Sequence, residues 1–438
     1  MLKFYNRETE MALLNTIEQR SQETAQMTIV VGRRRVGKTA LLNKVFSGEN
    51  TVYFFVEKKN ETLLCDELLE EIRLKLGTNI YGQIRNFKDV FAFLMDLSQN
   101  RHFTLIIDEF QEFRNINTAI YSEMQNVWDS KKDTSKLNLV LCGSVYSLMT
   151  KIFQNSKEPL FGRATAQLLL KAFDIKSLKN ILNDYYPEYK NEDLLAFYLF
   201  TGGVAKYVEL LVSAKAFTKK KILKEIFSEN SFFLNEGKNV LIEEFGKDYG
   251  NYFSILSLIA SSRTSRSEME SMMQTSLGGY LDKLDNEYNL IKKIRPIGTK
   301  PTGKEVKYQI EDNFLNFWFR FIYKYRSAIE IGRWDYVSDI VERDYETYSG
   351  LILEKYFTAK MIESKQFIGI GSYWDKKNEN QIDIVALRDE PNKAVAVEVK
   401  LQRKNYKPEA FALKVEHLKE KVFRGYEIEP VCLSLEDM

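Results

Sequence analysis

The sequence predicts an α/β protein that begins with a parallel sheet between helices and ends with a second, smaller sheet. Three observations lead to this fold class. Short β-branched apolar runs alternate with segments of helical periodicity over the first third of the chain. A long stretch of mainly helical periodicity follows, and two strand-like runs joined by a turn come near the end. Alternating strands and helices are typical of parallel sheets, because parallel neighbours need a crossover connection.

The composition is that of a globular protein with several domains. The 438 residues exceed one ordinary core, and 44% are hydrophobic and 28% charged. The net charge is only +2, so any nucleic-acid surface must be a local patch. Three cysteines without a C-x-x-C pair argue against a disulfide framework or a zinc site, and two histidines argue against imidazole catalysis. Without a signal-peptide pattern or a membrane-length apolar run, we expect a cytoplasmic protein with no membrane partner.

The clearest motif is Gly32–Thr39, which matches G-x-x-x-x-G-K-[ST] between the apolar run Met27–Val31 and the helix-like Ala40–Phe46. Backbone N–H groups of such a loop wrap a polyphosphate at a helix N-terminus, where the helix dipole is also favourable. We therefore predict that ATP binds here. Lys38 would reach the β- and γ-phosphates, and the Thr39 hydroxyl would ligate Mg²⁺. The predicted nucleotide-binding residues of this loop are Gly32, Arg33, Arg34, Arg35, Val36, Gly37, Lys38, Thr39 and Ala40.

The apolar run Phe103–Glu109 predicts a buried strand that ends in two acids. Ligands bind at the carboxyl ends of parallel strands, so Asp108 would lie beside the phosphates and hold the Mg²⁺ shell. Glu109 would orient and polarise the attacking water. The alternative is a strand that ends in a solvated acidic turn. Other predicted segments of this region are helices at 7–20, 62–76 and 86–98 and a strand at 51–56.

Two polar residues further along are weaker candidates. Ser144 follows the strand-like run Leu137–Cys142 and would sense the γ-phosphate, although a Gly-Ser turn is the alternative. Arg163 follows Gly162 and would act as an arginine finger, within its own subunit or towards a neighbour in a homo-oligomer. The alternative for Arg163 is a surface or salt-bridge residue.

Five short motifs follow one another along the chain: Phe4-x-Asn6-Arg7-Glu8, Gly32–Thr39, Leu105–Phe110, Cys142–Ser144 and Gly162–Arg163. This series resembles the archaeal ATPase family, a group of AAA+/STAND-type P-loop proteins also found in bacteria. The resemblance implies that Asn6 and Arg7 line an adenine pocket. It also implies a helical lid that closes over the nucleotide, in which Ala205 replaces the proline of the family's Gly-Gly-x-Pro-x-Tyr stretch.

The segment after the lid predicts a winged helix-turn-helix. Three helical runs, Tyr252–Ala260, Ser267–Met273 and Leu277–Tyr288, precede two strand-like pieces around a Pro/Gly turn. The third helix would enter a DNA major groove and the wing would contact phosphates. However, the third helix is mainly acidic, and a protein–protein module is the alternative. The basic residues of the wing are Lys292, Lys293, Arg295, Lys300, Lys304 and Lys307.

A second chemical signature lies near the C-terminus, on the predicted strands 381–387 and 394–400. Asp383 begins the first strand, and Glu398 and Lys400 share one face of the second. The two carboxylates, with a backbone carbonyl, would bind Mg²⁺. Lys400 would polarise water or stabilise developing negative charge.

The spacing Asp-x14-Glu-x-Lys resembles the PD-(D/E)xK nuclease core, and the archaeal ATPase family often carries such a C-terminal domain. Glu354, on a helix-like run around 349–356, matches the acid that the first helix of that core often contributes. The resemblance implies a restriction-endonuclease-like domain. Gln381 stands where relatives are expected to have an acid, which weakens a cutting role. The alternative is a β-hairpin with a salt-bridging face.

We therefore expect an ATP-hydrolysing protein whose nucleotide state drives a DNA-associated, nucleolytic tail. The alternative is a STAND-type switch that acts through a protein partner and whose tail cuts nothing. A purely structural DNA-binding adaptor would require a degenerate P-loop, which the intact motif argues against. The expected domains are a P-loop ATPase core at 1–172, a helical lid at 173–245, a winged helix at 246–330 and a nuclease-like domain at 331–438.

Overall fold

The computed structural model describes residues 3–80, 82–246, 249–300, 303 and 305–438. The chain divides into two compact units, one formed by Tyr5–Ala172 and the other by Met1–Phe4 together with Phe173–Met438. Lys304 of the predicted wing lies outside the described residues. In the described part of the chain, no helix combines the length and the apolar character needed to cross a membrane.

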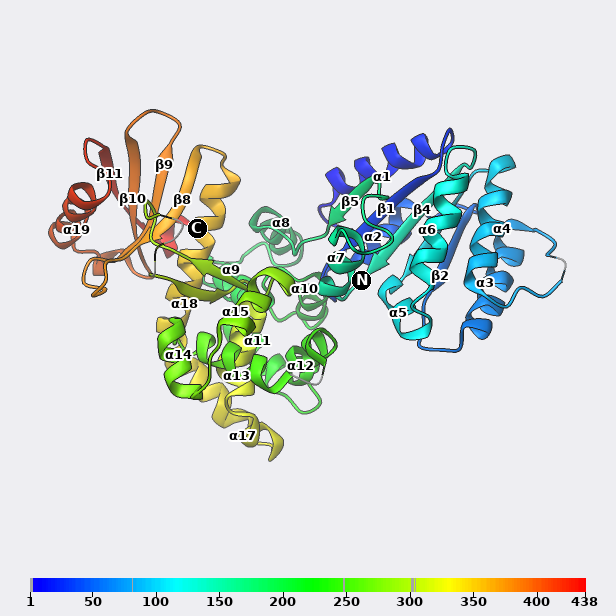
Figure 1. Ribbon diagram of the computed structural model, residues 1–438. Coiled ribbons are helices and arrows are strands. Elements are labelled where there is room, and N and C mark those ends of the chain that lie inside the picture. Colours follow the sequence, from blue (N-terminus) through cyan, green and yellow to red (C-terminus); the bar gives the residue numbers. More distant parts are fainter. Residues whose placement is uncertain (1–2, 81, 247–248, 301–302, 304) are drawn as a thin grey trace. The chain divides into compact units, whose positions relative to one another are not determined.

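The first unit is built around a parallel five-stranded sheet with the order β2-β3-β4-β1-β5 (Figure 1). Its strands are β1 (Gln26–Val31), β2 (Thr51–Phe55), β3 (Phe103–Asp108), β4 (Leu137–Gly143) and β5 (Ala166–Leu169). Strands β3 and β4 are buried along their whole length, which explains their continuous apolar sequences. The predicted parallel α/β core is therefore confirmed, and β3 has β2 and β4 as its neighbours.

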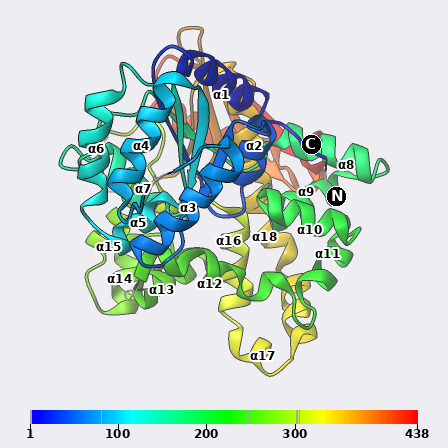
Figure 2. The same ribbon diagram turned by 90° about the vertical axis from the view of Figure 1, so that its right-hand side faces the viewer.

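Helices cover both faces of this sheet (Figures 1 and 2). They are α1 (Glu8–Ser21), α2 (Lys38–Val45), α3 (Glu61–Leu76), α4 (Phe87–Asn100), η1 (Phe110–Glu112), α5 (Phe113–Ile116), α6 (Ile120–Lys131) and α7 (Tyr146–Gln154). On one face, Leu14 of α1 and Leu41 of α2 share a core with Val30 and Val140 of the sheet. The larger core on the other face contains residues of α3, α4, α6 and α7. The sheet is therefore buried on both sides.

The second unit begins with helices in the region predicted as a lid. They are α8 (Ile175–Tyr185), α9 (Asn191–Thr201), α10 (Ala205–Ser213), α11 (Lys219–Ile226) and α12 (Phe232–Phe245). Their aromatic side chains pack with those of a later segment, as Phe200 does edge-to-face with Phe317 at a centroid distance of 4.9 Å. The region is helical, and its action as a lid stays a prediction.

Helical segments and an antiparallel hairpin follow. They are α13 (Tyr249–Ala260), α14 (Arg266–Met273), α15 (Gly278–Asp282), η3 (Lys283–Glu287), β6 (Ile291–Ile294), β7 (Lys307–Ile310), α16 (Asn313–Phe317), η4 (Trp318–Tyr323) and α17 (Arg326–Glu330). The predicted third helix is not one regular α-helix. Its first part is α-helical (α15), and its second part is π-helical (η3). The order is that of a winged helix-turn-helix, and the assignment itself stays a prediction.

The C-terminal part is a four-stranded mixed sheet with the order β11-β10-β9-β8. Its elements are α18 (Trp334–Glu363), β8 (Phe367–Tyr373), β9 (Ile382–Arg388), β10 (Lys393–Lys400), η5 (Arg403–Asn405), α19 (Pro408–Lys421), β11 (Glu427–Ser434) and η6 (Leu435–Asp437). The predicted hairpin is confirmed, since β9 and β10 pair antiparallel, while β10 and β11 are parallel. Helix α18 is much longer than the sequence predicts and contacts β8, β9 and β10. Phe411, Val415 and Leu418 of α19 pack on the sheet.

Candidate functional site

The loop Gly32–Thr39 joins β1 to the N-terminus of α2. Gly37 has a φ of +96°, a left-handed conformation that glycine adopts without strain. Gly32 leaves no space for a side chain, because a Cβ there would lie 2.7 Å from the carbonyl oxygen of Leu170. Among the other loop residues, Val36 is buried, Arg33 and Arg34 are partly buried, and Arg35, Thr39 and Ala40 are exposed. The two glycines therefore allow the chain to turn closely into the helix.

The side chain of Lys38 folds into this loop. Its amine donates hydrogen bonds to the carbonyl oxygens of Gly32 at 2.7 Å and Arg33 at 3.1 Å, and the residue is only 8% exposed. Burial lowers the pKa of Lys38, and the carboxylates of Glu109 and Asp108 oppose that shift. The ammonium is thus poorly hydrated, surrounded by loop backbone, and suited to a polyanion such as a triphosphate.

Asp108 lies at the end of β3, beside Thr39. Its Oδ2 accepts hydrogen bonds from the Thr39 hydroxyl at 3.2 Å and from the Tyr53 hydroxyl at 2.5 Å. Its Oδ1 accepts from the backbone N–H of Glu109 at 2.9 Å. Thr39 and Asp108 thus place two oxygens together, and oxygens are the ligands that Mg²⁺ prefers. The pair fits the predicted Mg²⁺ site.

Tyr53 was not predicted as part of this site. It lies on β2, which is the neighbour of β3, and faces Asp108 across the sheet. Burial raises the pKa of Tyr53, and its hydrogen bond to Asp108 raises it further, so the phenol stays protonated and can donate. No motif marks this residue, because the contact depends on strand order.

Glu109 is held from two sides. The Ser144 hydroxyl donates to both of its carboxylate oxygens at 2.7 Å, and the Gln111 amide contacts its Oε2. The backbone of Glu109 is left-handed, with a φ of +53°. The structure thus brings the predicted γ-phosphate sensor directly to the predicted water-activating residue. Gln111 was missed, and its only sequence signal is its place two residues after Glu109.

Arg163 lies in an ion pair. Its Nη2 is 2.8 Å from Oδ2 of Asp129, and its Nε also donates to that carboxylate. This is the arrangement that the salt-bridge alternative describes, and the arginine-finger role stays a prediction.

Asn6 and Arg7, predicted to line the adenine pocket, precede α1. Asn6 caps the backbone of Arg7 through its Oδ1 at 2.7 Å. The buried Arg7 guanidinium donates to the carbonyl oxygens of Val36 at 3.4 Å and Lys171 at 2.6 Å. Arg7 therefore fastens the phosphate loop to the segment after β5, a role that its sequence position did not suggest.

In the second unit, the predicted tail residues come together from three elements. Glu354 lies on α18, Asp383 on β9, and Glu398 and Lys400 on β10. Lys400 pairs with Glu398 at 2.7 Å, and Asp383 accepts from the backbone N–H of Val399 at 2.8 Å. Burial raises the pKa of Glu354 to about 8, and the charge of Asp383 adds to that shift. Burial also raises the pKa of Asp383.

Lys414 of α19 was not predicted in this cluster. Its amine lies 3.5 Å from the second carboxylate oxygen of Glu398, whose first oxygen is bound by Lys400. Within the described ranges, no three Asp, Glu, His or Cys side chains are grouped as a metal site would require. Magnesium binding by Asp383 and Glu398 therefore stays a prediction. In this structure the negative charge of Glu398 is balanced by the amines of Lys400 and Lys414.

The hairpin predicted as a DNA-contacting wing packs against the C-terminal sheet. The N–H of Ile297 donates to the carbonyl oxygen of Ser372 at 2.9 Å. Lys307 donates to Asn378 at 3.0 Å, and its amine lies 4.4 Å from the ring centroid of Trp374. Lys307 is therefore engaged within the chain rather than presented to a phosphate backbone. Lys292 and Lys300 are exposed.

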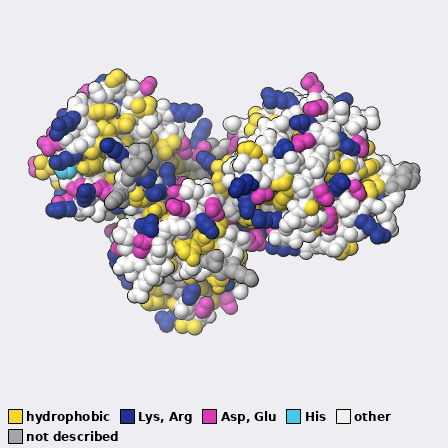
Figure 3. Space-filling model, viewed as in Figure 1, with side chains coloured by type: hydrophobic (Ala, Val, Ile, Leu, Met, Phe, Trp, Pro, Cys, Tyr) yellow, Lys and Arg dark blue, Asp and Glu magenta, His cyan; other side chains and the backbone are white. Residues whose placement is uncertain are grey.

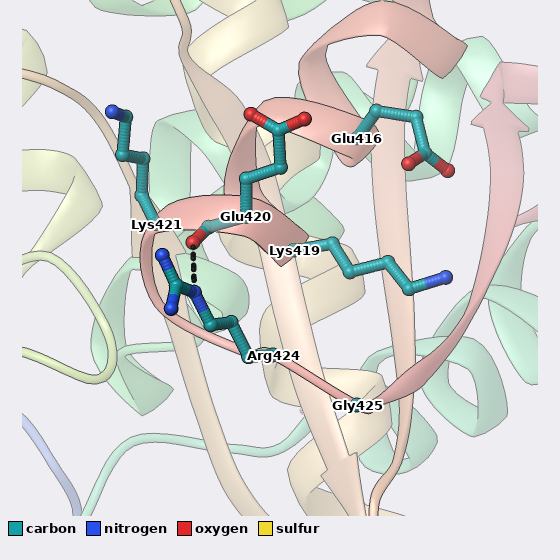
Figure 4. Close-up of a pocket in the computed structure, with 6 residues that line it drawn as sticks. All are labelled: Glu416, Lys419, Glu420, Lys421, Arg424 and Gly425. Carbon is teal, nitrogen blue, oxygen red and sulfur yellow. Dashed lines mark hydrogen bonds between the residues drawn. The ribbon is translucent and has the colours of Figure 1, made fainter.

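On the face shown in Figure 3, lysine and arginine are interspersed with acidic side chains instead of forming one basic stripe. An open pocket at the C-terminal end of α19 is lined by charged side chains and a glycine (Figure 4). These are Glu416, Lys419, Glu420, Lys421, Arg424 and Gly425. None of them is a predicted site residue.

Comparison with known proteins agrees with this architecture. Residues 4–211 match a family described as an ATPase domain predominantly from Archaea. Residues 318–411 match a family described as archaeal and bacterial proteins of unknown function. An uncharacterized protein of Methanocaldococcus jannaschii is 31% identical over 408 residues, which cover 91% of this chain and 87% of that protein.

A solved ATPase structure illustrates the likeness in fold. The Walker-type ATPase of Pyrococcus abyssi aligns with a TM-score of 0.56 at 19% identity, over 72% of this chain and 96% of that chain.

Proposed function

Because the chain belongs to the family of ATPases found predominantly in Archaea, we propose that it binds and hydrolyses ATP with Mg²⁺ at the loop Gly32–Thr39. One observation carries this proposal. The side chains of Lys38, Thr39, Asp108 and Glu109 meet at the carboxyl ends of β1 and β3. That edge of a parallel sheet is where ligands bind in open α/β folds.

Each residue has a distinct role in this proposal. The loop N–H groups and Lys38 bind the β- and γ-phosphates. Thr39 and Asp108 hold Mg²⁺, which supplies positive charge to the phosphate oxygens. Glu109 orients the attacking water and polarises it, and Ser144 senses the γ-phosphate. Tyr53 keeps Asp108 turned towards Thr39.

The test uses the purified full chain and two lysine variants. Titration calorimetry measures ATP affinity, and phosphate release measures hydrolysis. Lys38→Ala is expected to lose ATP binding, because it removes the buried ammonium of the loop. Lys44→Ala changes an exposed lysine on the same helix and is expected to behave as wild type. Wild-type affinity in Lys38→Ala would refute the site.

A second function is proposed for the C-terminal cluster: Mg²⁺-assisted cleavage of nucleic acid in a restriction-endonuclease-like domain. The supporting observation is that α18, β9 and β10 bring Glu354, Asp383, Glu398 and Lys400 within interaction range. In this proposal Asp383 and Glu398 bind the metal, and Lys400 stabilises the charge that develops on the phosphate. The exposed Lys292 and Lys300 of the winged-helix segment would contact DNA.

The competing proposal is a STAND-type switch, in which hydrolysis times the binding of a protein partner and the tail does not cut. It is favoured by the pairing of Glu398 with both Lys400 and Lys414, which balances its charge without a metal ion. Cleavage assays on the full chain separate the two proposals.

A further inference from the structure

We propose that Gln111 is a positioning residue for Glu109, required for ATP hydrolysis and dispensable for ATP binding. This inference rests on the proposed function, in which Glu109 orients the attacking water. Gln111 lies in η1, immediately after the strand that ends at Asp108, and its side chain is fully buried. Its amide nitrogen donates to Oε2 of Glu109.

The contact with Gln111 is one of two, among the described residues, that orient the Glu109 carboxylate. Glu109 directly follows β3 and has a left-handed backbone, and its carboxylate accepts hydrogen bonds from Ser144 and Gln111. Ser144, the residue after β4, supplies one partner, and Gln111 in η1 after β3 supplies the other. The Glu109 carboxylate therefore accepts hydrogen bonds from residues that follow two neighbouring strands, β3 and β4.

The Gln111 amide is itself held in one orientation. Its Oε1 occupies the space beside Gly143, where an added Cβ would lie 2.4 Å from that oxygen. The backbone carbonyl of Gln111 accepts a hydrogen bond from Tyr121 at 3.2 Å. Rotating the amide would point its oxygen at the Glu109 carboxylate, and two hydrogen-bond acceptors would then face each other without a donor.

The need to fill space in the core does not explain why a glutamine occupies position 111. Gln111 Oε1 is buried and has no hydrogen-bond partner among the described atoms, an arrangement that costs free energy. A methionine would fill similar volume without that penalty. The amide is therefore best explained by its one charged partner, Glu109.

ATP binding would affect the hydrogen bonds that Ser144 and Gln111 donate to Glu109 in different ways. In the proposed function Ser144 turns its hydroxyl to the γ-phosphate, and that would release its hold on Glu109. Gln111 is two residues from Glu109 in the chain, and its side chain is fully buried. It would then be the donor that keeps the Glu109 carboxylate aligned during hydrolysis.

The experiment measures kcat, KM and ATP affinity in the full chain for wild type, Gln111→Met, Glu109→Gln and Gln154→Met. Gln111→Met is expected to lower kcat by about tenfold or more while ATP affinity changes less than about twofold. Gln154→Met removes an exposed amide hydrogen bond of the same unit, to Gln167, and is expected to leave kcat unchanged.

The outcomes separate the two proposals. If Glu109→Gln hydrolyses ATP as wild type does, the proposed function of Glu109 is wrong. If Glu109→Gln is slow but Gln111→Met keeps wild-type kcat, only the role of Gln111 is overturned. A Gln111→Met protein that loses ATP binding or cooperative unfolding also overturns it, because the amide would then serve the fold.

Discussion

The hydroxyl of Ser144 lies 2.7 Å from each carboxylate oxygen of Glu109 and donates to that carboxylate across the ends of strands β4 and β3. The two residues are far apart in the chain and meet because β4 is the neighbour of β3 in the sheet. A change at Ser144 must therefore affect the geometry of Glu109 as well as any contact with phosphate.

We expect Ser144→Ala to lower kcat for ATP hydrolysis by about tenfold to a hundredfold, because it removes the hydroxyl that donates to Glu109 in this structure and that would contact the γ-phosphate in the proposed function. ATP affinity should change little, since Lys38 and the loop remain. Steady-state phosphate release and calorimetry measure the two quantities. Ser130→Ala is the control, because that hydroxyl bonds only to the backbone of its own helix among the described contacts. Equal kcat in wild type and Ser144→Ala would contradict the prediction.

Glu109→Gln should bind ATP normally and hydrolyse it about 10² to 10⁴ times more slowly. The amide keeps the shape and can still accept a hydrogen bond, but it lacks the charge that polarises water. Single-turnover hydrolysis with bound ATP isolates the chemical step. Glu70→Gln on α3 neutralises an exposed carboxylate of the same unit and should have no effect. Unchanged single-turnover rates in Glu109→Gln would remove its assigned role.

Arg163 can be tested against its ion-pair partner. Asp129→Asn breaks the ion pair but leaves the guanidinium, whereas Arg163→Ala removes it. If Arg163 only stabilises the fold, both variants should lower stability by up to about 1 kcal/mol and leave kcat alone. If it acts as an arginine finger, Arg163→Ala alone should lower kcat by about 10³ or more. We expect the first result, and thermal unfolding combined with phosphate release distinguishes the two.

The tail can be assayed separately from the ATPase unit. Mg²⁺-dependent cleavage of plasmid or oligonucleotide is expected in wild type and absent in Asp383→Ala and Lys400→Ala, with ATP hydrolysis unchanged. Lys393→Ala, an exposed lysine on the same strand β10, is the control. Failure of the wild-type chain to cut either DNA or RNA would favour the protein-partner switch.

The buried carboxyl of Glu354 predicts a pH dependence of stability. The folded chain keeps its proton between the ordinary pKa of 4.5 and the raised pKa of about 8, whereas the unfolded chain releases it. The folded state therefore binds more protons in this window, and the stabilisation is full below pH 4.5 and is lost as pH rises towards 8.

Glu354→Gln removes this titration. The melting temperature of the variant should rise relative to wild type as pH goes from 5 towards 8, by at least about 2 °C by calorimetry. Glu363→Gln on the same helix is a useful comparison, because burial raises its pKa less strongly. A difference between wild type and Glu354→Gln that does not depend on pH would refute the assigned shift.

The sequence alone determined the parallel α/β core, the strand–loop–helix unit around Gly32–Thr39 and the hairpin of Asp383 and Glu398. These features are local: periodicity, glycine placement and strand-end acids are all contained in short segments. The length of α18 and the π-helical break after α15 were not predicted, because the packing of a helix against distant segments decides where it ends.

Only the tertiary structure decided which side chains meet. Tyr53 reaches Asp108 because β2 is next to β3, and Ser144 reaches Glu109 because β4 is on its other side. Lys307 faces Trp374 instead of solvent because the hairpin tip packs on the C-terminal sheet. These contacts depend on the strand order and on packing between segments far apart in the chain. The spacing of residues within one short motif predicts neither the strand order nor this packing.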